Sequence, residues 1–159
     1  MSAQPHILLI DDDRAWLETL SEFLTENGLA VETAVTGDQG LVALEKPDIV
    51  LALIDYHLDG ERNGLDLLQE LRRRRHDLTT ILVSAEEELS LPAQALASGA
   101  RAFVPKTSSP RFILRTVRQA LAESDSLRAA PSPGRWLPGP SWWGRIFPLV
   151  PSSGKSWPY

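Results

Sequence analysis

The stretch Ile49-Val-Leu-Ala-Leu-Ile54, followed by Asp55, decides the fold of this 159-residue chain. Its apolar run is far shorter than the roughly 20 residues that a membrane-spanning helix needs. A strand that is apolar on both faces is typical of the centre of a parallel sheet, because helices cover both faces of such a sheet. We therefore expect residues 49–54 to form the most buried strand, with Asp55 at its carboxyl end.

Shorter apolar runs alternate with helical segments on both sides of this strand. The other expected strands are residues 7–10, 29–34, 80–84 and 102–104. Each strand is followed by apolar residues at helical spacing. Five β-then-α units in about 120 residues predict an α/β fold with a doubly wound, five-stranded parallel sheet and five helices.

The expected helices are marked by apolar stripes and by end signals. The first stripe is Trp16, Leu17, Leu20, Phe23 and Leu24, and the second is Leu41, Val42 and Leu44. The third is Leu65, Leu67, Leu68 and Leu71, the fourth runs from Ala93 to Ala97, and the fifth is Phe112, Ile113, Val117 and Leu121. Asn27-Gly28 and Gly99 are typical of helix C-termini, and Pro47 closes the second helix. Ser109-Pro110 predicts an N-cap followed by proline at the first helical position.

Composition and charge narrow the function classes. The chain is 43% hydrophobic and 23% charged, as is ordinary for a soluble globular protein. It has no cysteine, which excludes disulfides and thiol chemistry, and its N-terminus lacks the features of a secretory signal. We expect a cytoplasmic protein that does not act at a membrane.

The net charge of −5 is unevenly distributed. Residues 126–159 carry four cations and no acid, so that segment is +4 and residues 1–125 are −9 (−5 − 4). The acidic balance of the first segment argues against direct binding of nucleic acid by it.

Composition also changes near Ser124. Residues 131–159 hold seven of the 12 prolines and four of the five tryptophans. We expect a folded domain over 1–125 and a disordered Pro/Trp/Gly-rich tail over 126–159. The aromatic and basic residues of the tail leave three other roles open: docking on a partner, lying at a membrane surface, or folding back on the domain.

Chemically active side chains follow the strands. Asp11 and Asp12 come after the first strand, Asp55 after the third, Ser84 at the end of the fourth and Lys106 after the fifth. Ligands bind beyond the carboxyl ends of strands in open parallel sheets. Converging carboxylates raise each other's pKa unless a cation joins them, and oxygen ligands of this kind suit Mg²⁺. A metal, an ammonium and a hydroxyl around a carboxylate nucleophile are the groups needed for phosphoryl transfer to Asp55.

Four motifs, in this order at strand ends, resemble the receiver domains of two-component response regulators. They are Ile7-Leu-Leu-Ile-Asp-Asp-Asp13, Leu53-Ile-Asp-Tyr-His-Leu58, Ile81-Leu-Val-Ser-Ala85 and Gly99-Ala-Arg-Ala-Phe-Val-Pro-Lys106. The resemblance covers residues 5–123. It implies a flavodoxin-like sheet of strand order 2-1-3-4-5, as in the chemotaxis regulator.

The resemblance also implies a role for each residue at the metal. Asp55 matches the phosphoacceptor. Asp12 matches the direct Mg²⁺ ligand, Asp11 the acid that holds the metal through water, and the backbone carbonyl of His57 the third protein ligand.

Further roles concern the phosphoryl group. Lys106 matches the lysine that pairs with it, and Ser84 the hydroxyl that turns toward its oxygens. Phe103 stands at the aromatic switch position. The side chains of His57 and Glu86 occupy variable positions that tune how long the phosphoryl group lasts.

The implied function is that of a single-domain response regulator, because no DNA-binding or catalytic output module fits into residues 126–159. A sensor histidine kinase or a histidine phosphotransfer protein would phosphorylate Asp55. The surface of the fourth helix, fifth strand and fifth helix would then bind an unknown downstream protein or a second copy of the chain. Such a domain is not a conventional enzyme, since it assists only its own phosphorylation and dephosphorylation.

Two other functions compete with that of a phosphorylated response regulator. The chain could be a receiver-like interaction module that works without phosphorylation. A phosphohydrolase with an aspartyl-phosphate intermediate is disfavoured by His57, which stands where that class generally has a second acid. We expect Asp13 to be an exposed acid at a helix start. Residues 72–75, four arginines, are interpreted as a solvated helix end rather than a nucleic-acid site.

Overall fold

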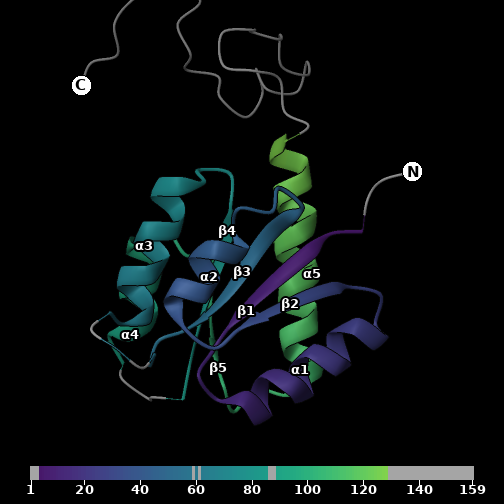
Figure 1. Cartoon of the computed structure of the whole chain (residues 1–159), viewed down its shortest axis with the longest axis horizontal. Helices are drawn as coiled ribbons and strands as arrows, with labels where there is room; N and C mark the ends of the chain where they lie inside the picture. The colour runs from purple at the N-terminus through teal and green to yellow at the C-terminus, as the bar shows by residue number, and fades with distance from the viewer. Residues whose placement is uncertain (1–3, 59, 61, 86–88, 129–159) are drawn as a thin grey trace, which may run out of the picture. The chain divides into compact units, whose positions relative to one another are not determined.

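The computed structural model describes residues 4–58, 60, 62–85 and 89–128, with side chains up to Ser124 (Figure 1). The last helix runs to Arg128, three residues beyond the expected domain boundary at 125. From residue 129 onward the expected tail lies outside the described residues, so its disorder stays a prediction.

Five parallel strands form one sheet in the order β2-β1-β3-β4-β5. The strands are β1 (His6–Ile10), β2 (Ala30–Ala34), β3 (Ile49–Asp55), β4 (Thr79–Ser84) and β5 (Ala102–Pro105). The predicted fold class and strand order are confirmed. The apolar run lies at the centre, and six of the seven residues of β3 are buried.

Helices cover both faces of the sheet. They are α1 (Arg14–Glu26), α2 (Gly37–Ala43), α3 (Gly64–Arg74), α4 (Leu91–Ala97) and α5 (Pro110–Arg128). α1 and α5 pack on one face, while α2, α3 and α4 pack on the other (Figure 1).

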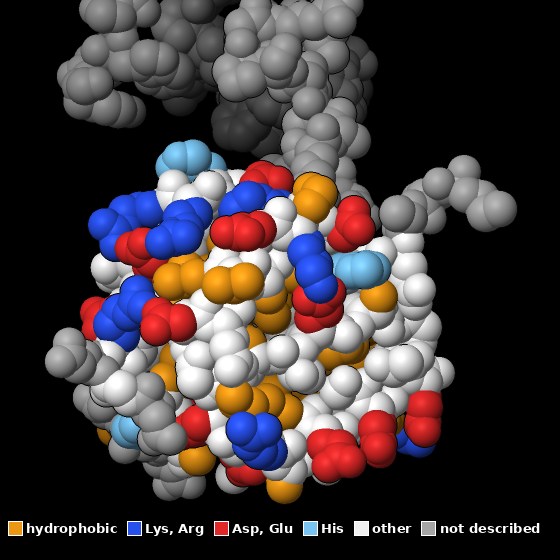
Figure 2. Space-filling view, in the orientation of Figure 1, with side chains coloured by type: hydrophobic (Ala, Val, Ile, Leu, Met, Phe, Trp, Pro, Cys, Tyr) orange, Lys and Arg blue, Asp and Glu red, His pale blue; other side chains and the backbone are white. Residues whose placement is uncertain are grey.

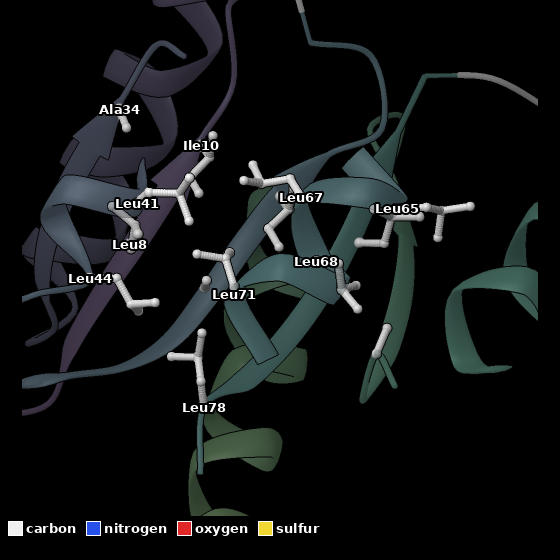
Figure 3. Packing of buried hydrophobic residues seen from close by; sticks show 14 of the residues in the cluster. Leu8, Ile10, Ala34, Leu41, Leu44, Leu65, Leu67, Leu68, Leu71 and Leu78 are labelled. Carbon is white, nitrogen blue, oxygen red and sulfur yellow. The ribbon is translucent and has the colours of Figure 1, made fainter. Parts of the chain in front are cut away.

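Alternate strand residues feed two separate cores. In β1, Ile7 and Leu9 face the α1–α5 side, whereas Leu8 and Ile10 face the α2–α4 side. Figure 3 shows the second of these cores, where the leucines of α3 lie over the central strands. Because successive side chains of a strand point to opposite faces, one apolar strand supplies both layers.

The expected helix signals are present. The chain leaves α1 through Asn27 and then Gly28, which has a φ of +90°, a conformation that glycine adopts without a steric penalty. The Ser109 hydroxyl accepts a hydrogen bond from Phe112 N at 3.2 Å and caps α5.

Three large apolar residues of the predicted stripes do not enter the core, and one of them is Leu96, which is 55% exposed. Val42 is 65% exposed and Phe112 is 47% exposed. Positions three, four and seven residues apart share a helix face, and Phe112 shares its face with Thr116 and Gln119 rather than with Val117. The prediction that Phe112 belongs to the buried stripe was therefore wrong.

Candidate functional site

Three carboxylates meet at the edge of the sheet where β1 and β3 end. Ile10 and Ile54 are paired in register, so the next residues, Asp11 and Asp55, are neighbours. One carboxylate oxygen from each of Asp11, Asp12 and Asp55 lies within 4.8 Å of the others. Mg²⁺–oxygen bonds of about 2.1 Å place opposite ligands about 4.2 Å apart. The spacing is therefore close to that of one ion's coordination shell.

Asp11 is fully buried and has one oxygen that suits a metal. Its Oδ1 accepts a hydrogen bond from Asp13 N at 2.8 Å. Its Oδ2 forms an ion pair with Lys106 Nζ at 2.6 Å, yet among the described residues no group donates a hydrogen bond to it in suitable geometry. Oδ2 already has the Lys106 ammonium as a charge partner, so a metal-bound water at this oxygen would share it with Lys106.

Asp13 serves the helix rather than the carboxylate cluster. It is exposed, and its Oδ1 accepts a hydrogen bond from Trp16 N at 3.1 Å, which makes it the N-cap of α1. Asp12 is half-buried and belongs to the cluster. Of three consecutive aspartates, two therefore point into the site and the third starts the helix.

Burial shapes the electrostatics of the carboxylates. Asp55 is 4% exposed, and this burial together with the charge of Asp11 raises the pKa of Asp55 to about 7, although Lys106 opposes the change. Burial also raises the pKa of Asp11, against the effect of Lys106 and the Asp13 N–H group. Deprotonating both acids in this pocket is unfavourable unless further positive charge arrives.

Lys106 is the cation that the structure brings to the cluster. Its backbone N donates a hydrogen bond to Ser84 O at 2.8 Å, which fixes the chain just after β5. Its Nζ lies 2.6 Å from Asp11 Oδ2 and 3.5 Å from Asp55 Oδ2. Burial alone would lower the pKa of Lys106, but the two carboxylates outweigh it and raise that pKa above its ordinary value.

Trp16 is a neighbour of Lys106 that sequence reasoning missed. The sequence pattern predicts only that Trp16 belongs to the apolar stripe of the first helix. The centre of its ring lies 4.9 Å from Lys106 Nζ. The signal that could have indicated this contact is the position of Trp16 four residues after Asp12, in the first turn of the helix that begins beside the carboxylates.

Ser84 and Phe103 lie on the strands next to the cluster. Ser84 is the last residue of β4 and is 1% exposed, one position beyond Val83, which is paired with Asp55. Phe103 in β5 is half-buried and packs against the core of the α2–α4 side. Their roles as switch residues stay predictions.

His57 and Glu86 are the two residues predicted to tune access to Asp55. The side chain of His57 is exposed and meets the Tyr56 ring edge-on, with ring centres 5.0 Å apart. Glu86 lies outside the described residues, so its role stays a prediction.

The backbone after Asp55 turns back tightly onto the start of α3. Gly64 N donates a hydrogen bond to Tyr56 O at 2.7 Å, and a Cβ atom at position 64 would lie 2.3 Å from Asp55 O. Only glycine fits there without displacing the backbone of the acidic residue. Asn63 and Asp66 form a capping box that starts the helix at this point.

The arginines of residues 72–75 lie near acids at the end of α3. Two of them pair with Glu70, one pairs with Asp77, and the remaining one donates a hydrogen bond to Leu78 O at 3.3 Å. Figure 2 shows positive and negative side chains side by side over this part of the molecule. This arrangement fits a solvated helix end better than a nucleic-acid site.

In the described part of the chain, no helix has both the length and the apolarity to cross a membrane.

Residues 7–118 match the family model described as the response regulator receiver domain. The chain belongs to this family. The receiver domain is 36% identical over 118 residues to the transcriptional activator protein ExaE of Pseudomonas putida, an alignment that covers 73% of this chain and 55% of that protein. It is 30% identical over 125 residues to the transcriptional regulatory protein GlrR of Escherichia coli K12, covering 78% of this chain and 28% of GlrR.

Solved structures agree with this assignment. The crystal structure of a CheY-like response regulator receiver domain protein from Methanospirillum hungatei superposes with a TM-score of 0.73 at 30% identity. That match covers 79% of this chain and 99% of the other. The receiver domain thus accounts for nearly all of that neighbour, whereas the chain spans only about half or less of the two transcriptional regulators.

Proposed function

We propose that this receiver domain accepts a phosphoryl group on Asp55 from the phosphohistidine of a sensor histidine kinase or a histidine phosphotransfer protein. The observation that carries the proposal is the meeting of Asp11, Asp12 and Asp55 at one strand edge, with Lys106 Nζ 2.6 Å from Asp11 and 3.5 Å from Asp55. A buried carboxylate beside an ammonium is a nucleophile held where negative charge can be stabilised.

In the transfer, a carboxylate oxygen of Asp55 attacks the phosphorus atom of the donor. The P–N bond to the donor imidazole breaks, a P–O bond to Asp55 forms, and the imidazole leaves with the bond's electron pair. Asp11, Asp12, Asp55 and the backbone carbonyl of His57 would hold Mg²⁺, which would supply positive charge to neutralise the acids and the phosphoryl oxygens. The spacing of the three acids fits such an ion.

The remaining residues bind the phosphoryl group and control access to it. Lys106 is close enough to Asp55 to pair with phosphoryl oxygens attached there. The hydroxyl of Ser84, at the end of the adjacent strand, donates a hydrogen bond to another oxygen. The side chains of His57 and Glu86 limit the approach of water and so set the lifetime of the aspartyl phosphate.

The switch couples this chemistry to the surface of α4, β5 and α5. As Ser84 moves toward the phosphoryl group, Phe103 turns further into the core and the adjacent surface changes shape. Phe103 is half-buried, so part of its ring surface is still exposed and could be buried by such a change. Exposed apolar residues on this surface, Leu96 at 55% and Phe112 at 47%, suit binding of a downstream protein or a second copy.

The test is phosphorylation of the full chain by acetyl phosphate with Mg²⁺, followed by intact-mass spectrometry. We expect the wild type to gain one phosphoryl group and Asp55→Asn to gain none. Asp48→Asn is a matched control, because Asp48 is an exposed acid at the opposite end of the same strand. An unlabelled wild type, or equal labelling of Asp55→Asn, would refute the proposal and favour a module that works without phosphorylation.

A further inference from the structure

The ammonium of Lys106 lies over the aromatic ring of Trp16 as well as beside two carboxylates. Lys106 Nζ has Asp11 Oδ2 at 2.6 Å and Asp55 Oδ2 at 3.5 Å, and the centre of the Trp16 ring lies at 4.9 Å. The Lys106 side chain is only 15% exposed as a result. A cation within about 6 Å of a tryptophan ring centre is attracted by the ring, and more strongly where water is excluded.

The same short segment places both the ring and one of the carboxylates. Asp13 N donates a hydrogen bond to Asp11 Oδ1, and Trp16 N donates one to Asp13 Oδ1. These two bonds tie the start of α1 to the carboxylate that pairs with Lys106. The position of the ring is also stabilised by packing, because Trp16 contacts the α1–α5 core. Asp11 and Trp16 are therefore presented to Lys106 as one rigid unit.

A lysine side chain is long and flexible, so its ammonium needs several neighbours to stay in one place. The two carboxylates attract it but also attract any metal that enters the site. When a cation satisfies the acids, the ring is the contact to Lys106 that does not compete for that cation. A ring face also tolerates small displacements of the ammonium, as a directional hydrogen bond does not.

We propose that Trp16 is a positioning residue for phosphoryl transfer, whose ring holds the Lys106 ammonium at the edge of the Asp55 carboxylate. The inference rests on the proposed function, since it concerns the rate of that reaction. The competing explanation is that Trp16 is merely a core residue of α1. Phe23 separates the two, because it packs against the same core about 10 Å further along the helix axis, seven residues after Trp16.

The first test compares Trp16→Leu with Phe23→Leu in the full chain. Both variants lose packing, so both should unfold at lower temperature than the wild type. Only Trp16→Leu should slow phosphorylation by saturating acetyl phosphate, by about three- to thirty-fold, the range expected for a desolvated cation–π contact. Trp16→Tyr retains a ring and should recover most of the rate. The Mg²⁺ affinity of all three variants should stay near that of the wild type.

The second test does not depend on metal or phosphorylation. The chain has three lysines, Lys46, Lys106 and Lys155, so ¹³C-labelled lysine gives a simple NMR spectrum. A ring 4.9 Å from Nζ should shift the Lys106 ε-protons upfield relative to the other two. Trp16→Leu should abolish this shift, and Phe23→Leu should preserve it.

The outcomes separate this inference from the function on which it rests. If the wild type is not phosphorylated, the proposed function fails, whatever the NMR spectrum shows. If the wild type is phosphorylated and Trp16→Leu and Phe23→Leu slow the reaction equally, Trp16 is a packing residue and the inference is wrong. Lysine ε-protons without a ring shift in the wild type would also overturn it, even if Trp16→Leu failed to fold.

Discussion

Replacing Asp55 by asparagine should stabilise the folded domain when divalent cations are removed. The carboxyl of Asp55 is 4% exposed and its pKa is raised from an ordinary 3.8 to about 7. The folded state therefore holds a proton that the unfolded state releases between about pH 4 and pH 7, and stability falls as the pH rises through this window. Asparagine has a similar shape and does not ionise, so it should not show this loss.

The magnitude follows from the pKa difference. Each tenfold change in the proton equilibrium corresponds to about 1.36 kcal/mol, so raising the pKa from 3.8 to about 7 costs the folded state about 4 kcal/mol above pH 8. Relaxation of Lys106 and entry of monovalent cations reduce this figure, and we expect a gain of about 2–4 kcal/mol for Asp55→Asn. For a domain of this size, such a gain raises the midpoint of thermal unfolding by about 5–15 °C.

The assay is thermal unfolding by circular dichroism in EDTA at pH 5 and pH 8, repeated at pH 8 with Mg²⁺. The advantage of Asp55→Asn should be small at pH 5 and large at pH 8. Added Mg²⁺ should stabilise the wild type more than the variant, because the wild type has the additional carboxylate ligand. Glu18→Gln, a change at an exposed acid of α1, serves as the control and should show no such pH dependence. The reasoning is refuted if Asp55→Asn is less stable than the wild type at pH 8 in EDTA, or if its advantage is equal at both pH values.

Three further predictions concern the same region. Mg²⁺ affinity should fall by up to about tenfold per pH unit below pH 7, because Asp55 must release its proton, and isothermal titration calorimetry should detect that proton in buffers of different ionisation enthalpy. Gly64→Ala should cost about 2–4 kcal/mol in urea unfolding, since its Cβ meets Asp55 O at 2.3 Å; a cost below that of a typical surface substitution would contradict the close approach. Asn63→Ala removes half of the capping box and should cost about 1 kcal/mol, while phosphorylation of Asp55 continues.

The fold could be predicted from the sequence because its strongest signals are local. The apolar run at residues 49–54 has no polar face, which requires a strand covered on both sides, and turn residues mark where each helix ends. The observed strands extend by a residue or so beyond the apolar runs, for example to His6, Asp55 and Pro105. Backbone pairing in a parallel sheet continues past the last buried side chain, and apolarity alone does not report that pairing.

The candidate site was less predictable in one respect. Strand ends indicate which side chains converge, because parallel strands place their carboxyl ends at one edge of the sheet. Strand ends do not indicate which helix residue contacts the side chains gathered at that edge. Trp16 and Lys106 are 90 residues apart, and the amphipathic pattern of α1 explains Trp16 fully without any partner in the site. Phe112 illustrates the reverse case, since its position next to Ile113 suggested burial while the helix face turned it outward.

The position of Lys106 bears on the proposed switch. In this structure Lys106 is shared unequally, at 2.6 Å from Asp11 and 3.5 Å from Asp55. A phosphoryl group on Asp55 would add negative charge there, so Lys106 would be drawn away from Asp11 and toward Asp55. Asp11 is buried and cannot be left unpaired without a large cost, and a cation in the cluster removes that cost. Under the proposed function, metal binding and phosphorylation would therefore be coupled through one ammonium, and the Trp16 ring is the neighbour that would stay in contact with Lys106 in both states.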